Sequence, residues 1–78
     1  MTRLELAKHT IDTIYDTLLT LVNEGQLCPE DAEDLLFRKI VTIRQSLVRN
    51  NSVSCVDFYG FILFCQEREN FFTNLANY

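Results

Sequence analysis

Two runs of apolar residues, each spaced by three and four positions, constrain this chain more than any other feature of its sequence. The first run occupies residues 4–21 and the second residues 32–47. An α-helix places residues at these steps on one face, so each run predicts an amphipathic helix whose apolar stripe packs on a core. The stripe residues are Leu4, Ala7, Ile11, Ile14, Leu18 and Leu21 in the first run and Ala32, Leu36, Ile40, Ile43 and Leu47 in the second.

Capping and breaking residues indicate where both helices begin and end. Thr2 starts a Thr-x-x-Glu capping box, and Gly25 suits the left-handed position that follows many helices. Pro29 suits the first position of the next helix, where its missing N–H costs nothing. We therefore expect helices over residues 3–24 and 29–49, and the short link between them makes the pair an antiparallel hairpin.

The last third of the chain is rich in aromatic residues. Ser54 is placed to cap a helix over residues 55–75, with the charged residues 67–69 opposite its apolar face. The segment 58–65, FYGFILFC, also suits a buried strand, because aromatic side chains favour strands. We favour the helix, since a single strand in so short a chain has no other strand to pair with.

These elements predict an all-α fold: a three-helix bundle built on the hairpin of residues 3–24 and 29–49, with the aromatic-rich helix 55–75 as its third member. A chain of 78 residues with 47% apolar side chains is long enough for one small domain, over residues 1–78. The longest nearly apolar stretch, residues 53–65, is too short for a spanning helix, which needs about 20 residues. We therefore expect no membrane partner.

The third helix has more apolar surface than the hairpin can cover. Seven of the eight residues in 58–65 are apolar, which exceeds one stripe of a helix. Each Phe left in water gives up roughly 1.5–3 kcal/mol, so we expect part of this surface to meet another chain. The alternative is a central third helix wrapped by the other two. The apolar residues expected at the contact are Phe37, Tyr59, Phe61 and Leu63.

The charges are segregated along a chain whose net charge is −4. Residues 1–34 carry a net charge of −6 and residues 35–50 one of +4. The acidic excess argues against direct contact with nucleic acid, because phosphate backbones are bound by basic surfaces. It favours contact with a basic groove on a partner protein. The acidic residues expected at that contact are Asp12, Asp16, Glu24, Glu30 and Glu33.

Few residues are equipped for catalysis or metal binding. His9, the only histidine, lies on the expected polar face of the first helix, and no motif links it to a nucleophile. Cys28, Cys55 and Cys65 stand at least ten residues apart, whereas zinc sites usually take two ligands from one turn. We expect no catalytic, metal-binding or cofactor-binding residue and no enzymatic activity. An odd number of cysteines and a charged N-terminus predict reduced thiols in the cytoplasm or nucleus.

One family resemblance concerns the hairpin. The segment of roughly residues 4–50 contains a helix, the turn Gly-Gln-x-x-Pro at residues 25–29, Ala32 and a Leu/Phe-rich helix, and the pair Phe64-Cys65 follows later. This order resembles the N-terminal half of the small subunit of general transcription factor IIA. The resemblance implies a hairpin that joins a bundle with a partner subunit. The chain has no room for that family's β-barrel half and lacks its Trp-containing strand.

The sequence therefore predicts a protein that binds another protein, or a second copy of itself as a homodimer, and performs no chemistry. We expect a small acidic regulator or inhibitor that acts through acidic and aromatic helix surface. Small size and acidity suit a phage- or virus-encoded protein. The alternative, which the resemblance implies, is a helical subunit or adaptor of a nucleic-acid-bound assembly such as a transcription complex.

Overall fold

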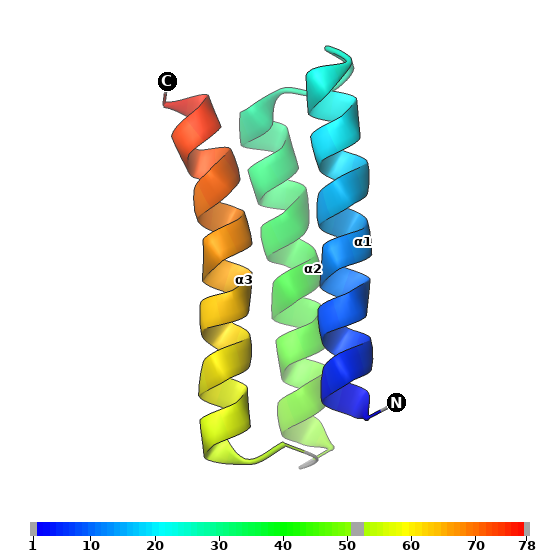
Figure 1. Cartoon of the computed structure of the whole chain (residues 1–78), viewed down its shortest axis with the longest axis vertical. Helices are drawn as coiled ribbons and strands as arrows, with labels where there is room; N and C mark the ends of the chain where they lie inside the picture. The colour runs from blue at the N-terminus through cyan, green and yellow to red at the C-terminus, as the bar shows by residue number, and fades with distance from the viewer. Residues whose placement is uncertain (1, 51–52, 78) are drawn as a thin grey trace.

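The protein is a bundle of three α-helices. The computed structural model describes residues 2–50 and 53–77, with α1 at Arg3–Asn23, α2 at Pro29–Arg49 and α3 at Cys55–Ala76. Each helix runs antiparallel to the one before it, so α1 and α3 point the same way and α2 packs against both (Figure 1). The predicted all-α three-helix bundle is confirmed, and every helix end falls within one residue of the expected position.

Residues 58–65, for which a strand was the alternative, are helical throughout. Ser54 caps this helix, because its Oγ accepts the backbone N–H of Asp57 at 3.2 Å. Thr2 does the same for α1, where its Oγ1 accepts the N–H of Glu5 at 3.1 Å. Each cap satisfies an amide that has no carbonyl partner inside its helix, which explains why both helices begin where the sequence indicates.

The reversal after α1 depends on Gly25. Its φ of +75° lies in the left-handed region, which glycine adopts without a steric penalty. The Gly25 N–H donates to the Val22 carbonyl at 3.1 Å, and the Gln26 N–H reaches back to the Leu21 carbonyl at 2.9 Å. This pair of bonds is a Schellman motif. It ends α1 sharply and lets α2 return alongside it.

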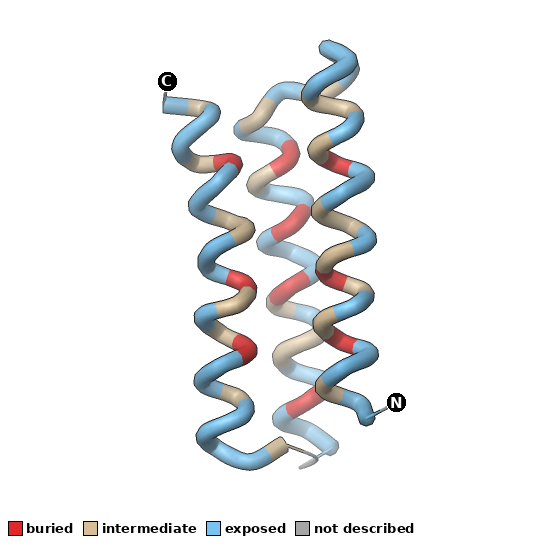
Figure 2. The backbone as a smooth tube through the Cα atoms, viewed as in Figure 1, coloured by how far each residue is buried: buried red, intermediate tan, exposed pale blue. Residues whose placement is uncertain are grey.

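One core runs through the bundle and takes residues from all three helices. Figure 2 shows the buried positions on the inward side of each helix. The buried members from α1 and α2 all belong to the two apolar stripes expected from the sequence, and Leu4, Ile14 and Ile43 of those stripes are half buried. The buried residues are Ala7, Ile11, Leu18, Ala32, Leu36, Ile40, Leu47, Phe61, Cys65 and Phe72.

The charged segment Glu67-Arg68-Glu69 does not lie together on the solvent face of α3, as the sequence suggested. Only Glu67 is exposed, whereas Arg68 and Glu69 are half buried. The reason is the rotation of the helix about its axis. Cys65 and Phe72 set the inward side, and helical spacing places Arg68 and Glu69 on the two flanks of that side.

Candidate protein-binding surfaces

The solvent side of α3 carries three apolar residues in its first half, which we call the α3 stripe. Val56, Tyr59 and Leu63 are 81%, 64% and 43% exposed. Their spacing of three and four places them on one side of the helix, roughly opposite the buried Phe61. Gly60 lies beside them in the helix, so the stripe has no bulky side chain covering it at that position.

Of the four apolar residues expected at a contact, three are accessible. Tyr59 and Leu63 belong to the α3 stripe, and Phe37 is 49% exposed on α2. The expectation for Phe61 is wrong: its ring is 0% exposed and stacks on Phe64 with ring centroids 6.4 Å apart. The inward side of α3 needs a large side chain at this level of the core, and Phe61 supplies it. Since α3 has a core side and a solvent side, it is not a central helix wrapped by the other two.

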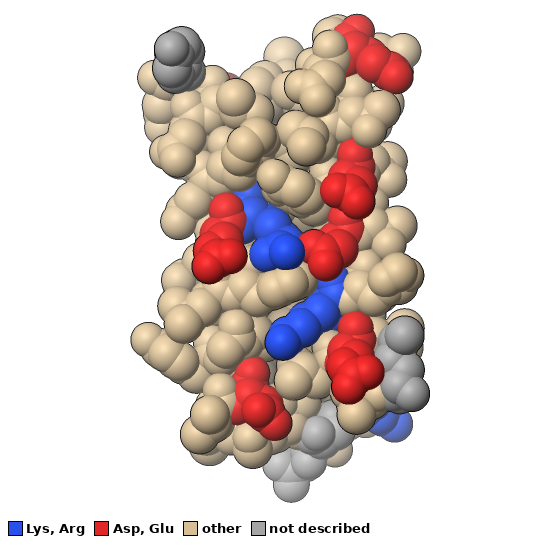
Figure 3. All heavy atoms as spheres, viewed as in Figure 1, with Lys and Arg blue, Asp and Glu red and all other residues tan. Residues whose placement is uncertain are grey.

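The acidic residues expected to bind a partner lie on different parts of the bundle. Asp12 and Asp16 are one turn apart on α1, and Glu24 is the C-cap of that helix. Glu30 and Glu33 belong to the first turns of α2. On the face shown in Figure 3, basic side chains occupy the middle, and acidic ones flank them over both α1 and α3. The structure therefore does not bring the five residues together into one acidic patch.

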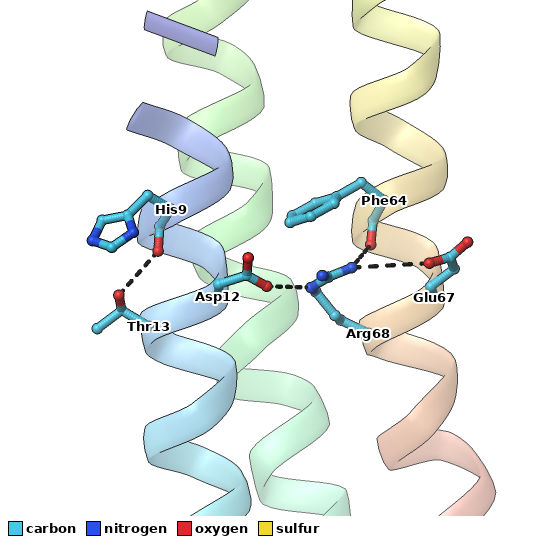
Figure 4. A network of polar contacts seen from close by, with 6 residues as sticks. All are labelled: His9, Asp12, Thr13, Phe64, Glu67 and Arg68. Atoms are coloured by element: carbon cyan, nitrogen blue, oxygen red, sulfur yellow. Dashed lines mark hydrogen bonds and ion pairs between the residues drawn. The ribbon is translucent and has the colours of Figure 1, made fainter. Parts of the chain in front are cut away.

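Asp12 is engaged within the chain by Arg68, which links α3 to α1 (Figure 4). Arg68 Nε donates to Asp12 Oδ1 at 2.7 Å, and Arg68 Nη1 donates to the carbonyl of Phe64 at 2.9 Å. The guanidinium carbon lies 3.5 Å from the centroid of the Phe64 ring, so the cation stacks on the aromatic face. With its side chain only 22% exposed, Arg68 is a cross-link between helices and not a free surface charge.

Two side chains of α3, Glu69 and Cys65, have pKa values above their ordinary ones. Burial raises the pKa of Glu69, and the nearby Glu33 raises it further, while Arg44 acts in the opposite direction. Burial is also the main cause that raises the pKa of Cys65 to about 11, so this thiol stays protonated at neutral pH. Glu33, which was expected to bind a partner, is half buried on α2.

The raised pKa of Glu69 predicts a pH-dependent effect of the variant Glu69→Gln. A carboxyl whose pKa rises on folding favours the folded state fully only below its ordinary pKa, and this contribution is lost as the pH rises through the folded value. We therefore expect Glu69→Gln to melt at a higher temperature than the wild type at pH 7. The advantage should shrink towards pH 4, where Glu69 becomes protonated and neutral like the amide.

Thermal unfolding followed by circular dichroism at pH 4 and pH 7 checks this expectation. Glu67→Gln is the matched control, because the side chain of Glu67 is 80% exposed and should gain little at either pH. If Glu69→Gln raises the melting temperature equally at both pH values, the raised pKa of Glu69 is contradicted.

The cysteines and the histidine do not assemble into a metal site. Cys28 and Cys55 are exposed, and Cys65 is buried. Over residues 2–50 and 53–77, no three His, Cys, Asp or Glu side chains come close enough to hold a metal ion. His9 is exposed on α1, where its backbone carbonyl accepts the hydroxyl of Thr13 at 3.0 Å.

A groove lies between α2 and α3 near the end of α2. Its walls are apolar at Val41, Val48 and Phe58, and two cations, Arg44 and Arg49, stand among them. Val48 is 62% exposed, although it belongs to the apolar part of α2. This groove was not expected from the sequence. The sequence signal for the groove is a set of apolar and charged residues that recur at helical spacing on α2 but do not belong to its core stripe.

Comparison with protein-family models, curated proteins and solved structures finds no match for this chain. Within the described residues, none of the helices is both long and apolar enough to cross a bilayer.

Proposed function

We propose that this chain is a non-enzymatic protein-binding module, a small acidic regulator or inhibitor that docks through the α3 stripe. The observation that carries the proposal is the exposure of Val56, Tyr59 and Leu63 on one side of a single helix. Burying a large apolar side chain is worth roughly 1.5–3 kcal/mol. A chain of this size has a net stability of about 4–12 kcal/mol. The burial free energy that three such exposed side chains forgo is therefore large compared with that stability, unless a partner covers them.

The residues beside the α3 stripe define the chemistry of that partner. Glu67 follows Leu63 by one helical turn and its side chain is 80% exposed, and Asp57 lies next to Val56 in the first turn. The net charge of the chain is −4. The matching surface is an apolar cleft on another protein with lysine or arginine at its rim, because opposite potentials steer and align the two surfaces.

The cysteines support a reducing compartment for this activity, such as the cytoplasm. All three are free thiols, and two of them are exposed. Exposed free thiols persist where glutathione and thioredoxin keep them reduced and are liable to oxidise elsewhere.

Substitution of Tyr59 tests the proposed function. With the chain as bait in an extract of the cells that produce it, we expect Tyr59→Asp to lose the partner that the wild type captures. Binding of the purified partner should weaken by about 30-fold or more, since removal of a central aromatic contact costs at least about 2 kcal/mol. A captured subunit of a transcription complex would favour the assembly role that the hairpin resemblance implies.

The matched control for this experiment is Leu6→Asp, which places the same charge on an exposed apolar residue of α1. Leu6 is 55% exposed and lies away from the α3 stripe. We expect Leu6→Asp to retain the partner. Equal capture by the wild type, Tyr59→Asp and Leu6→Asp would show that the α3 stripe is not the binding surface.

A further inference from the structure

α2 carries a second line of residues at helical spacing, distinct from its core stripe, which we call the α2 seam. Successive members are separated by four, three, four, three and four positions, the repeat by which two helices pack along each other. The seam lies on the side of α2 that borders the groove against α3, since two of its apolar members line that groove. Its members are Glu30, Asp34, Phe37, Val41, Arg44 and Val48.

The C-terminal half of the seam is basic and apolar. Val41, Arg44 and Val48 line the groove together with Arg49 and Phe58. Phe58 is only half buried and Val48 is 62% exposed, so the groove presents apolar walls to solvent beside two cations. A segment that fills it should supply an apolar side chain flanked by carboxylates.

The N-terminal half of the same seam has that composition. Phe37 is 49% exposed, and the carboxylates of Glu30 and Asp34 precede it on the same side of the helix. Asp34 forms an ion pair with Arg38 at 3.1 Å, and both side chains are more than half exposed. Such a surface pair contributes about 0.3–0.5 kcal/mol and is easily exchanged for another partner.

We propose that two copies of this chain form a homodimer in which their α2 helices pack antiparallel along the α2 seam. The groove and the N-terminal half of the seam, which we call the ridge, lie on one face of one helix, so a twofold axis near residue 39 lets each copy fill the groove of the other. In this register Asp34 of one copy faces Arg44 of the other, and Phe37 packs on Val41 across the axis. A heterologous partner would satisfy the groove alone, whereas a second copy satisfies both halves of the seam at once.

The proposed dimer goes beyond the proposed function, because it uses α2 and leaves the α3 stripe free for a different protein. The seam runs from Glu30 to Val48, which is 18 steps along α2 or about 27 Å at 1.5 Å per residue and covers most of the helix. Two chains with a net charge of −4 repel each other overall. The local pairing of acidic with basic ends is what selects the antiparallel register over a parallel one, in which like charges would meet.

A charge exchange in the full chain tests the dimer. We expect the wild type to have twice its 9.1 kDa mass by light scattering and sedimentation between about 1 and 100 µM. The ridge variant Glu30→Lys/Asp34→Lys and the groove variant Arg44→Glu/Arg49→Glu should each be monomers, because like charges then face each other. An equal mixture of the two should recover the dimer mass, since each variant complements the other at both ends of the seam.

Two controls keep the result specific. Asp16→Lys/Glu24→Lys makes the same charge change on α1 and should remain a dimer. Circular dichroism verifies that each variant is helical, and if the groove variant does not fold, Arg44→Gln/Arg49→Gln replaces it, since this variant removes both cations of the groove without adding a carboxylate near Glu69.

A wild type that stays monomeric over this range, folded variants that still dimerise alone, or a mixture that does not associate would each overturn the proposed dimer. The outcome is separate from the proposed function. A monomer that still loses its partner on Tyr59→Asp refutes only the dimer, and a dimer whose capture is indifferent to Tyr59→Asp refutes only the role of the α3 stripe.

Discussion

Phe61→Ala is expected to destabilise the fold by about 3–5 kcal/mol, the largest effect of any single substitution considered for this chain. Phe61 is a large side chain with 0% exposure, and residues of all three helices contribute to the core that surrounds it. Truncation removes its apolar burial and leaves a cavity, because the closely packed neighbours in the core relax only in part. Against a total of about 4–12 kcal/mol, this loss leaves a marginal fold.

Urea unfolding followed by circular dichroism measures the effect. Tyr59→Ala is the matched control, since Tyr59 lies two positions away on the same helix but is 64% exposed. We expect the control to change the free energy of unfolding by about 0.5 kcal/mol or less. Similar losses at the two positions would mean that the inward side of α3 is not the one that contains Phe61.

Arg68→Met is expected to cost about 2 kcal/mol, the second largest effect. The substitution keeps an apolar stem against the Phe64 ring but removes the 2.7 Å ion pair to Asp12 and the cation stacked on the ring. Asp12 remains about half exposed, so water solvates its carboxylate after the change and the loss stays below that of a buried charge left alone.

Arg38→Met provides the comparison for Arg68. Arg38 also lies 3.1 Å from a carboxylate, that of Asp34, but its side chain is 73% exposed and its loss should cost less than about 0.5 kcal/mol. A double-mutant cycle of Arg68→Met with Asp12→Asn, measured by urea unfolding, isolates the pair itself. A coupling energy near zero would show that the contact between α1 and α3 contributes nothing to stability.

The hairpin was predictable from sequence because its signals are local and agree with one another. Thr2 marks a helix boundary by its side-chain hydroxyl and Gly25 and Pro29 by their backbone conformation, with no help from the rest of the fold. The apolar stripes of α1 and α2 are narrow enough to fix the inward side of each helix. Propensity, periodicity and capping therefore all indicated the same two elements.

The orientation of α3 was not predictable in the same way. Residues 58–65 are apolar on every side, so the sequence does not distinguish the buried Phe61 from the exposed Tyr59 and Leu63. The orientation is decided by packing against two other helices, which is a property of the assembled core. The same rotation carries Arg68 to the flank facing α1, where it meets a carboxylate that the sequence analysis had assigned to a partner.

The candidate surfaces show the same difference between features that depend on nearby residues and features that depend on how the helices pack together. Phe37, Tyr59 and Leu63 are accessible, as residues of a contact surface must be. The placement of the acidic residues could not be predicted, because net charge along a sequence gives no information on which helix faces are adjacent. Asp12 pairs with Arg68 within the chain, Glu33 is half buried, and Asp16, Glu24 and Glu30 are exposed.

The up-down-up order of the helices has a consequence for how quickly the chain reaches its native state. Consecutive helices are neighbours joined by short turns, so many of the contacts join residues that are near in sequence, and proteins with such low contact order fold in microseconds to milliseconds. The link between Arg68 and Asp12, which lie 56 positions apart, closes a long loop. It therefore forms late, after the hairpin, and its removal should speed unfolding while leaving the folding rate nearly unchanged.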